Sequence, residues 1–157
     1  MKHLKTFENW FTNIFKKSDD FWQDYMDDVL GSNFGRSNYN ALFGAAEEGN
    51  WSRFKNLLPK YKKYINDIAT EINDDNTTST ANILTKIVTS NNSGLWEKKK
   101  MIKSVIDNGV DIYFTNEKGE SFYDLIKDER LKKWFDETYP NLVEQILLNK
   151  NTIKYNL

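Results

Sequence analysis

Few residues of this chain have the types and spacing that enzymatic chemistry requires. The 157 residues include no cysteine and one histidine, His3. Thiolate nucleophiles, disulfides and zinc fingers are therefore excluded, and acid–base catalysis or metal binding by histidine is nearly excluded. The motifs of phosphate-binding loops, dinucleotide-binding folds and serine-hydrolase nucleophile elbows do not occur. We predict that the chain is not an enzyme and that it binds neither a metal nor a cofactor.

Charged side chains gather at three places that chemistry could use. One predicted helix carries five aspartates: Asp19, Asp20, Asp24, Asp27 and Asp28. A metal site or an acidic patch that mimics nucleic acid is one interpretation, but we favour a solvated face that complements the helix dipole. Asp74 and Asp75 lack the spacing of a calcium-binding loop and indicate a polar surface loop. The basic run of Lys98, Lys99 and Lys100 is more typical of a solvated helix face than of phosphate binding.

The overall charge limits the partners that the chain can have. Basic and acidic residues number 22 and 23, so the net charge is −1. General binding of nucleic acid needs a basic surface, and we expect no such binding. No stretch approaches roughly 18 consecutive apolar residues, so we expect that the chain is not an integral membrane protein. Residues 1–17 also lack the apolar core of a secretory signal. We predict a cytoplasmic protein, either bacterial or, if phage-encoded, in the cytoplasm of the host cell.

The elements that would position these residues are predicted to be helices, beginning with two in residues 1–38. The first has an apolar stripe at three- and four-residue steps: Leu4, Phe7, Trp10, Phe11, Ile14 and Phe15. The second runs through Phe21 and Tyr25 and ends at Gly31. Exposing such a stripe to water is unfavourable, so we expect it to pack as a cap on the following residues. A partner, a second copy of the chain bound through residues 4–15, or lipid could cover it instead.

A pattern of small and apolar residues followed by glycine begins at Asn40. One short predicted helix ends at Gly49, and a second begins at Trp51. The pattern resembles the ankyrin repeat, whose motif runs T-P-L-H-x-A-A-x-x-G-H before a helix that ends in Leu-Leu. The matching positions are Leu42, Ala45, Ala46, Gly49, Leu57 and Leu58.

A second match to the ankyrin motif lies nearer the C-terminus. Residues 105–112 resemble L-L-x-x-G-A-D-I, and residues 116–125 resemble D-x-x-G-x-T-P-L-x-L. Gly109 suits a left-handed residue at the end of a helix, and Gly119 suits the tip of a β-turn. Ser121 is expected to cap a further helix. The helix after that one has three apolar residues: Leu131, Trp134 and Phe135.

A weaker unit lies between these two. Residues 82–88 fit its first helix and residues 96–107 fit its second. Spacings longer than the family period of about 33 residues predict two insertions, at 74–80 and 89–94. Apolar residues from Tyr61 to Ile72 also have helical spacing. Two structures therefore remain open before the first insertion, an extra helix or an extended finger.

These patterns predict an all-α fold in three parts. Residues 1–38 form an N-terminal helical cap, residues 39–137 form a short ankyrin-like stack of three helix pairs, and residues 138–157 form a C-terminal capping helix and a tail. The capping helix follows Pro140, and the tail begins at Asn149. Three aromatic residues are expected in the core: Phe54, Trp134 and Phe135.

The resemblance implies a function, because ankyrin-like stacks are mostly protein-binding scaffolds whose finger tips and inner helices form a concave face. We expect the chain to occupy a partner protein sterically, without turnover. The expected contact residues are Phe43, Glu47 and Glu48 on the first inner helix, Trp51 at the edge of the packing, and Tyr113, Phe114, Asn116, Glu117 and Lys118 on the finger between repeats. One alternative is a phage counter-defence inhibitor or an immunity protein that binds a bacterial toxin or defence protein. Another is membrane-surface binding through the N-terminal helix.

Overall fold

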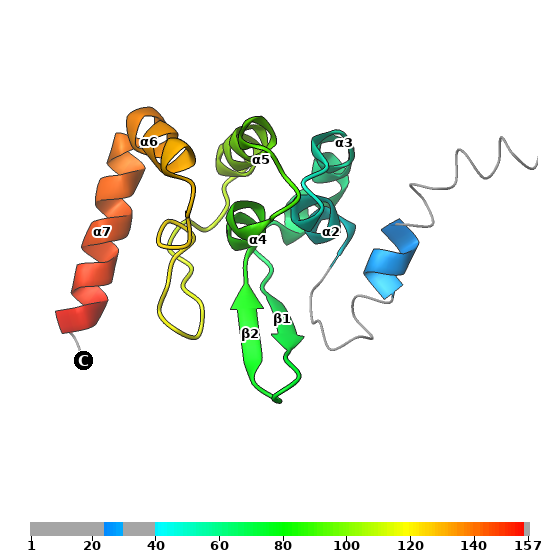
Figure 1. Cartoon of the computed structure of the whole chain (residues 1–157), viewed down its shortest axis with the longest axis horizontal. Coiled ribbons are helices and arrows are strands. Elements are labelled where there is room, and N and C mark those ends of the chain that lie inside the picture. The colour runs from blue at the N-terminus through cyan, green and yellow to red at the C-terminus, as the bar shows by residue number, and fades with distance from the viewer. Residues whose placement is uncertain (1–23, 30–39, 156–157) are drawn as a thin grey trace, which may run out of the picture.

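The computed structural model describes residues 24–29 and 40–155. Over this part of the chain the protein is mostly helical, with one small two-stranded sheet. The helices lie in two rows (Figure 1). The inner row contains α2 (Ala41–Glu47) and α4 (Ile83–Thr89), and the outer row contains α3 (Trp51–Tyr61), α5 (Leu95–Asp107) and α6 (Glu129–Thr138). The last helix, α7 (Pro140–Tyr155), packs against α6 at the end of the rows.

Buried apolar side chains from both rows form one continuous core. α2 contacts α3 and α4, and α5 contacts α3, α4 and α6, so each helix pair is covered by its neighbour. The largest fully buried side chains are Phe43, Phe54, Phe122, Phe135, Leu42, Ile83, Leu84, Ile87, Met101, Ile102, Leu131 and Ile146. Burying each of these contributes roughly 1.5–3 kcal/mol. The predicted core positions of Phe54 and Phe135 are confirmed, and Trp134 packs partly buried against the core.

Local signals in the sequence define where the helices begin and end. Asn40, Asn50 and Asn82 precede α2, α3 and α4, and each side chain accepts a hydrogen bond of 2.9–3.0 Å from a backbone N–H of the first turn. Such bonds satisfy donors that have no partner within the helix. Gly49 after α2 and Gly109 after α5 have φ angles of +68° and +81°. The predicted left-handed conformation of Gly109 is therefore confirmed.

Two projections extend from the inner row on the side away from the outer row (Figure 1). Finger 1 (residues 69–81) is an antiparallel hairpin of β1 (Ala69–Ile72) and β2 (Thr78–Ala81). Finger 2 (residues 111–121) is a loop in which one antiparallel bridge joins Thr115 to Ser121. Before the first predicted insertion, the sequence is compatible with an extra helix or an extended finger. The extended finger forms as finger 1, and it follows a 3₁₀ turn, η1 (Lys62–Tyr64). The two strands make the fold mostly helical rather than strictly all-α.

Two segments near the C-terminus differ from the prediction. The helix expected after Ser121 is reduced to turns, in which the Ser121 hydroxyl donates to Asp124 Oδ2 at 2.7 Å. The next N-cap is Asp128, whose carboxylate accepts from the backbone N–H of Arg130. The chain between the two caps is too short for a helix and a loop. The tail predicted to begin at Asn149 is instead helical, because α7 continues past Asn149 to Tyr155.

The described part of the predicted N-terminal cap is residues 24–29. They form a helical segment, called the acidic helix below, which lies against α2 and α3. The apolar stripe at residues 4–15, and the interpretations that depend on it, lie outside the described residues.

Candidate binding surface

The two fingers are fastened to each other by side chains. Glu117 in finger 2 accepts hydrogen bonds from the backbone N–H and the hydroxyl of Thr80 in finger 1, at 2.8 and 2.9 Å. A hydrogen bond from its own backbone N–H and those from Thr80 hold the pKa of Glu117 below its usual value. At the base of the fingers, Asn66 accepts from the N–H of Asp111 at 2.6 Å and donates to the carbonyl of Gly109 at 3.2 Å. The fingers therefore form one surface rather than two independent loops.

Lys86 joins finger 1 to the inner row. Its side chain, from α4, is buried, and its ammonium lies 2.5 Å from Glu71 on β1 and 3.6 Å from Glu47 at the end of α2. A buried ammonium is unfavourable unless carboxylates neutralise it, so these contacts fix how the hairpin stands on the inner helices. Sequence reasoning missed Lys86, because nothing in the spacing of α4 marks its one lysine as buried.

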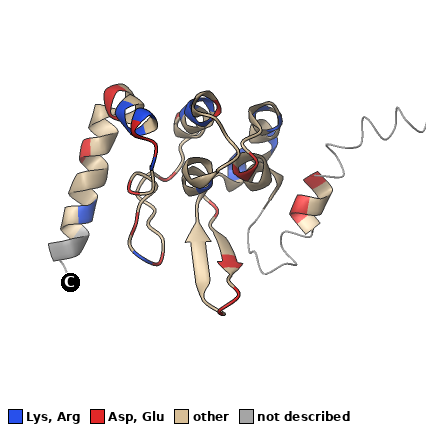
Figure 2. Ribbon diagram, viewed as in Figure 1, with Lys and Arg blue, Asp and Glu red and all other residues tan. Residues whose placement is uncertain are grey.

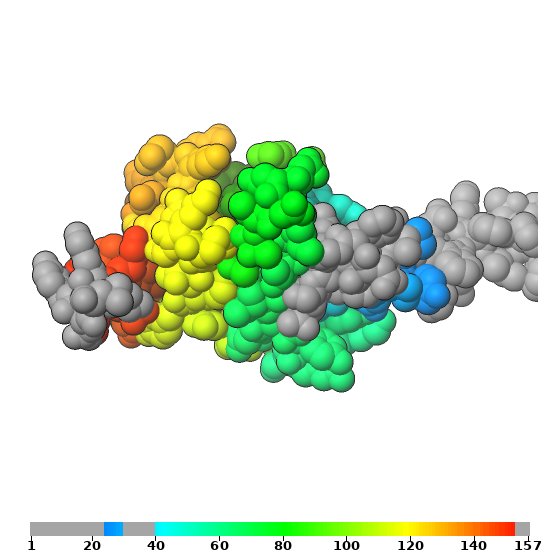
Figure 3. All heavy atoms as spheres, turned by 90° about the horizontal axis from the view of Figure 1, so that it is seen from below, coloured from blue at the N-terminus to red at the C-terminus, as the bar shows by residue number. Residues whose placement is uncertain are grey.

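Carboxylates dominate the finger side of the molecule, and basic groups are frequent on the outer row (Figure 2). Residues 65–82 contain four carboxylates and no basic residue, and finger 2 contains three carboxylates and one lysine. In contrast, α3 with η1 contains five basic residues and no acidic one. Seen from below, finger 1 in green and finger 2 in yellow lie side by side at the surface (Figure 3). The finger side is thus an exposed and mainly acidic projection.

The predicted contact residues of the first helix pair lie in different environments. Phe43 is fully buried, so its prediction as a partner contact is wrong. The reason is that α2 packs against both α3 and α4, which leaves Phe43 no free face. Glu47 lies on the finger side beside the buried lysine of α4, whereas Glu48 forms an ion pair of 2.9 Å with Arg53. Trp51 lies in the outer row against a second tryptophan.

The predicted contact residues of finger 2 divide into exposed and structural ones. Tyr113 is 44% exposed, and its hydroxyl donates to Gln145 of α7 at 2.9 Å. Phe114 is half-buried. The side-chain oxygen of Asn116 accepts from the backbone N–H groups two and four residues later, at 3.0 and 2.9 Å, so this residue shapes the turn. Lys118 is exposed at the turn, and Glu117 is exposed beside it.

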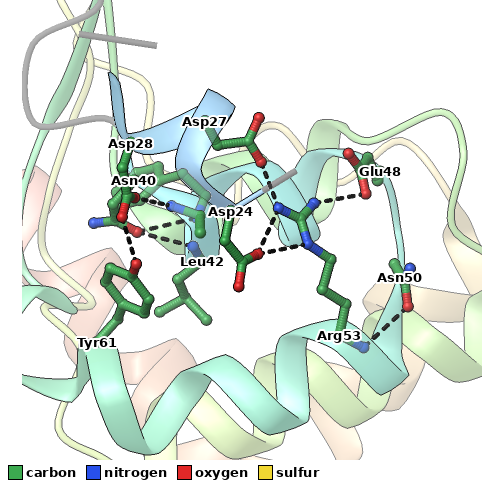
Figure 4. A network of polar contacts seen from close by, with 11 residues as sticks. Asp24, Asp27, Asp28, Asn40, Leu42, Glu48, Asn50, Arg53 and Tyr61 are labelled. Carbon is green, nitrogen blue, oxygen red and sulfur yellow. Dashed lines mark hydrogen bonds and ion pairs between the residues drawn. The ribbon is translucent and has the colours of Figure 1, made fainter. Parts of the chain in front are cut away.

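Arg53 holds the acidic helix against α3 (Figure 4). Its guanidinium is buried and donates to Asp24 at 2.9 and 3.1 Å, to Asp27 at 2.6 Å and to Glu48 at 2.9 Å. Burial disfavours the charge, but the hydrogen bonds to Asp27 and Asp24 outweigh it and raise the pKa of Arg53. One arginine thus gathers three carboxylates from two segments of the chain.

A further aspartate fixes the other edge of the acidic helix. Asp28 accepts hydrogen bonds from the backbone N–H of Ala41 at 2.8 Å and from the hydroxyl of Tyr61 at 2.6 Å. Burial, followed by the bond to Asp28, raises the pKa of Tyr61 above its usual value. The interpretation of this run as a solvated face is therefore wrong for Asp24, Asp27 and Asp28. Their partners lie 13 to 33 residues away, where spacing within one helix gives no signal.

A cavity of about 220 Å³ lies between the end of α4, the start of α5 and the chain before α6. Lys98 lines it, and burial lowers the pKa of this lysine. Its ammonium donates to the carbonyl of Val88 at 3.0 Å, which satisfies an acceptor in the last turn of α4. We therefore interpret Lys98 as a residue that completes the end of α4.

No protein-family model, no curated protein and no solved structure matches the chain. Within residues 24–29 and 40–155, no cluster of three or more histidine, aspartate or glutamate side chains is placed to hold a metal ion. In the same part of the chain, no helix has the length and apolar character needed to cross a membrane. Inference about function therefore depends on the fingers and the two rows of helices.

Proposed function

We propose that the protein is a non-enzymatic binding module of the ankyrin type, which acts by occupying a surface of a partner protein. The state of the fingers carries this proposal. They are joined to each other and to the inner row by side-chain contacts, and residues 72–78 and 117–119 at their tips are exposed. Ile72 is 59% exposed, and Lys118 is exposed at the turn of finger 2. Rigid projections lose little conformational entropy on binding, so their exposed side chains are suited to recognition.

The order of the elements supports the ankyrin comparison. A short inner helix precedes a longer outer helix in α2 with α3 and in α4 with α5, and a finger follows each outer helix. Gly49 and Gly109 are left-handed where the ankyrin motif has glycine. The third unit keeps its outer helix, α6, but has turns in place of an inner helix. The proposal thus has the support of two full units and one partial unit.

We propose that the partner contacts lie on the finger tips and on the part of the inner row beside them. Of the contacts predicted from the sequence, we retain Glu47, Tyr113, Glu117 and Lys118, whose side chains are at least partly exposed on the finger side. Binding there would hold or mask the partner by steric occupation, without a chemical step. Scaffolding and inhibition both fit this mechanism.

Site-specific crosslinking tests the proposal. A photo-reactive residue replaces Lys118 in finger 2 or, as the matched control, the exposed Lys133 in α6 of the outer row. The finger position is expected to capture a discrete partner, in the cells that produce the protein, that the control position does not capture. Circular dichroism verifies that both variants are folded. Capture of the same proteins from both positions would mean that the fingers are not the specific binding face. Capture of no protein from the finger position would contradict the proposal that the fingers bind a partner.

A further inference from the structure

The outer row carries an aromatic surface that the proposed function does not use. Trp96, near the start of α5, is 56% exposed. Its ring contacts Trp51 of α3 edge-on, with the ring centroids 6.5 Å apart. Tryptophan is among the residues that contribute most when buried at protein interfaces, and a large exposed apolar ring is unfavourable in water. Trp96 is therefore suited to anchor a binding partner.

The same two-residue pattern occurs in both outer helices. In α3, Trp51 is followed four residues later by Lys55, and in α5, Trp96 is followed four residues later by Lys100. Residues four apart lie on the same face of a helix. The Lys100 ammonium lies 5.5 Å from the centre of the Trp96 ring, and Lys55 is exposed. Because α3 and α5 pack side by side, the two pairs form one surface.

The surface continues toward α6. The ammonium of Lys99, the residue before Lys100, lies 5.5 Å from the centre of the Trp134 ring. Two neighbouring ammonium groups of α5 thus lie over indole rings, one on α5 and one on α6. Among the described residues, no ion pair joins Lys55, Lys99 or Lys100 to a carboxylate, whereas Lys103 on the same helix is paired with Asp107. Within the described part of the chain, these three ammonium groups thus have no carboxylate at ion-pair distance.

We propose that this Trp–Lys face (Trp51, Lys55, Trp96, Lys99 and Lys100) is a second protein-binding surface, and that its partner is an acidic protein segment. An apolar side chain of the segment covers Trp96, and its carboxylates meet the ammonium groups beside the rings. A polyanion such as nucleic acid fits less well, because the chain has a net charge of −1 and its fingers carry six carboxylates and one lysine. The face is separate from the fingers, so the two surfaces can be tested independently.

The test is a titration of the isotope-labelled full chain, followed by the indole N–H signals in NMR spectra. The probe is a peptide of repeated Glu-Glu-Leu units. The indole signals of Trp51 and Trp96 are expected to shift, and a Lys55→Glu, Lys100→Glu double variant is expected to weaken binding about tenfold or more. The matched control, Lys62→Glu with Lys63→Glu, makes the same charge change in η1 and is expected to leave affinity within about twofold.

Several outcomes would overturn this assignment. Equal weakening by the two double variants would mean that the peptide responds to overall charge and not to this face. Tighter binding of a Lys-Lys-Leu peptide would reverse the assigned partner charge. Shifts of the indole signals with anionic lipid vesicles or single-stranded DNA, but not with the acidic peptide, would mean that this face binds another class of partner. Crosslinking from finger 2 is expected to be unchanged in the Lys55→Glu, Lys100→Glu variant, which keeps this test separate from that of the proposed function.

Discussion

Replacing Arg53 by methionine is expected to free the acidic helix and to lower the free energy of unfolding by about 2–4 kcal/mol. The guanidinium makes four hydrogen bonds of 2.6–3.1 Å to three carboxylates. Methionine retains most of the apolar stem but leaves these carboxylates without a cation. Removing one partner from a buried ion pair costs about 3–5 kcal/mol. We expect less here, because the carboxylate side chains are 15–43% exposed and can turn toward water.

Urea denaturation of the wild type and the variant measures this difference directly. In a chain of this size, a loss of this magnitude corresponds to a thermal midpoint lower by about 4–15 °C. A double-mutant cycle with Asp24→Asn isolates the contact between the two segments, and we expect a coupling energy of about 1 kcal/mol or more. Arg130→Met is the matched control, since the Arg130 side chain is 77% exposed and pairs with a residue at the start of its own helix. Its expected effect is within about 0.5 kcal/mol.

Two results would refute this reasoning. Equal losses of stability in Arg53→Met and Arg130→Met would mean that burial adds nothing to the arginine contacts. A coupling energy near zero between Arg53 and Asp24 would mean that the acidic helix is held by other contacts.

Three further predictions concern backbone strain, pH and the base of finger 1. Gly49→Ala is expected to lower the free energy of unfolding, measured by urea denaturation, more than Gly109→Ala does. Both glycines have positive φ, but a methyl group added at Gly49 would also overlap the backbone before α5. Burial and then the hydrogen bond to Asp136 raise the pKa of Tyr123 to about 12. The unfolded chain ionises this tyrosine near pH 10, so its stabilisation is complete below pH 10 and is lost between pH 10 and 12. Substitution of Tyr123 by phenylalanine is expected to remove this part of the pH dependence of the urea midpoint. Lys86→Met is expected to speed hydrogen exchange of the β1 amides and to leave those of α6 unchanged, since it removes the ammonium between hairpin and inner row.

The parts of the fold that depend on local signals could be predicted from the sequence. Gly109 ends its helix as expected, because a left-handed residue there is a property of a few neighbouring positions. The helix expected after Ser121 does not form, although a serine cap is present, because the cap of α6 follows too soon. A local start signal says nothing about how much chain is available before the next element.

The candidate surfaces were less predictable, because exposure and pairing depend on distant parts of the chain. Phe43 was expected at the surface from its place in the repeat motif, but neighbours on two sides bury it. The partners of Arg53 in the acidic helix lie 26 and 29 residues before it. The Trp-x-x-x-Lys spacing in α3 and α5 was visible in the sequence, but its meaning depends on the packing of the two helices side by side.

The contacts described above join residues that are close along the chain, and this affects folding during synthesis on the ribosome. Of the hydrogen bonds described above, the one between Asn66 and Asp111 spans the greatest distance along the chain, 45 residues. Each helix pair contacts the next pair rather than a distant one. A nascent chain can therefore complete its first helix pairs while the ribosome is still adding α6 and α7. Early units would bury their apolar faces soon after synthesis, which shortens the time in which they can aggregate, and the local topology favours fast folding.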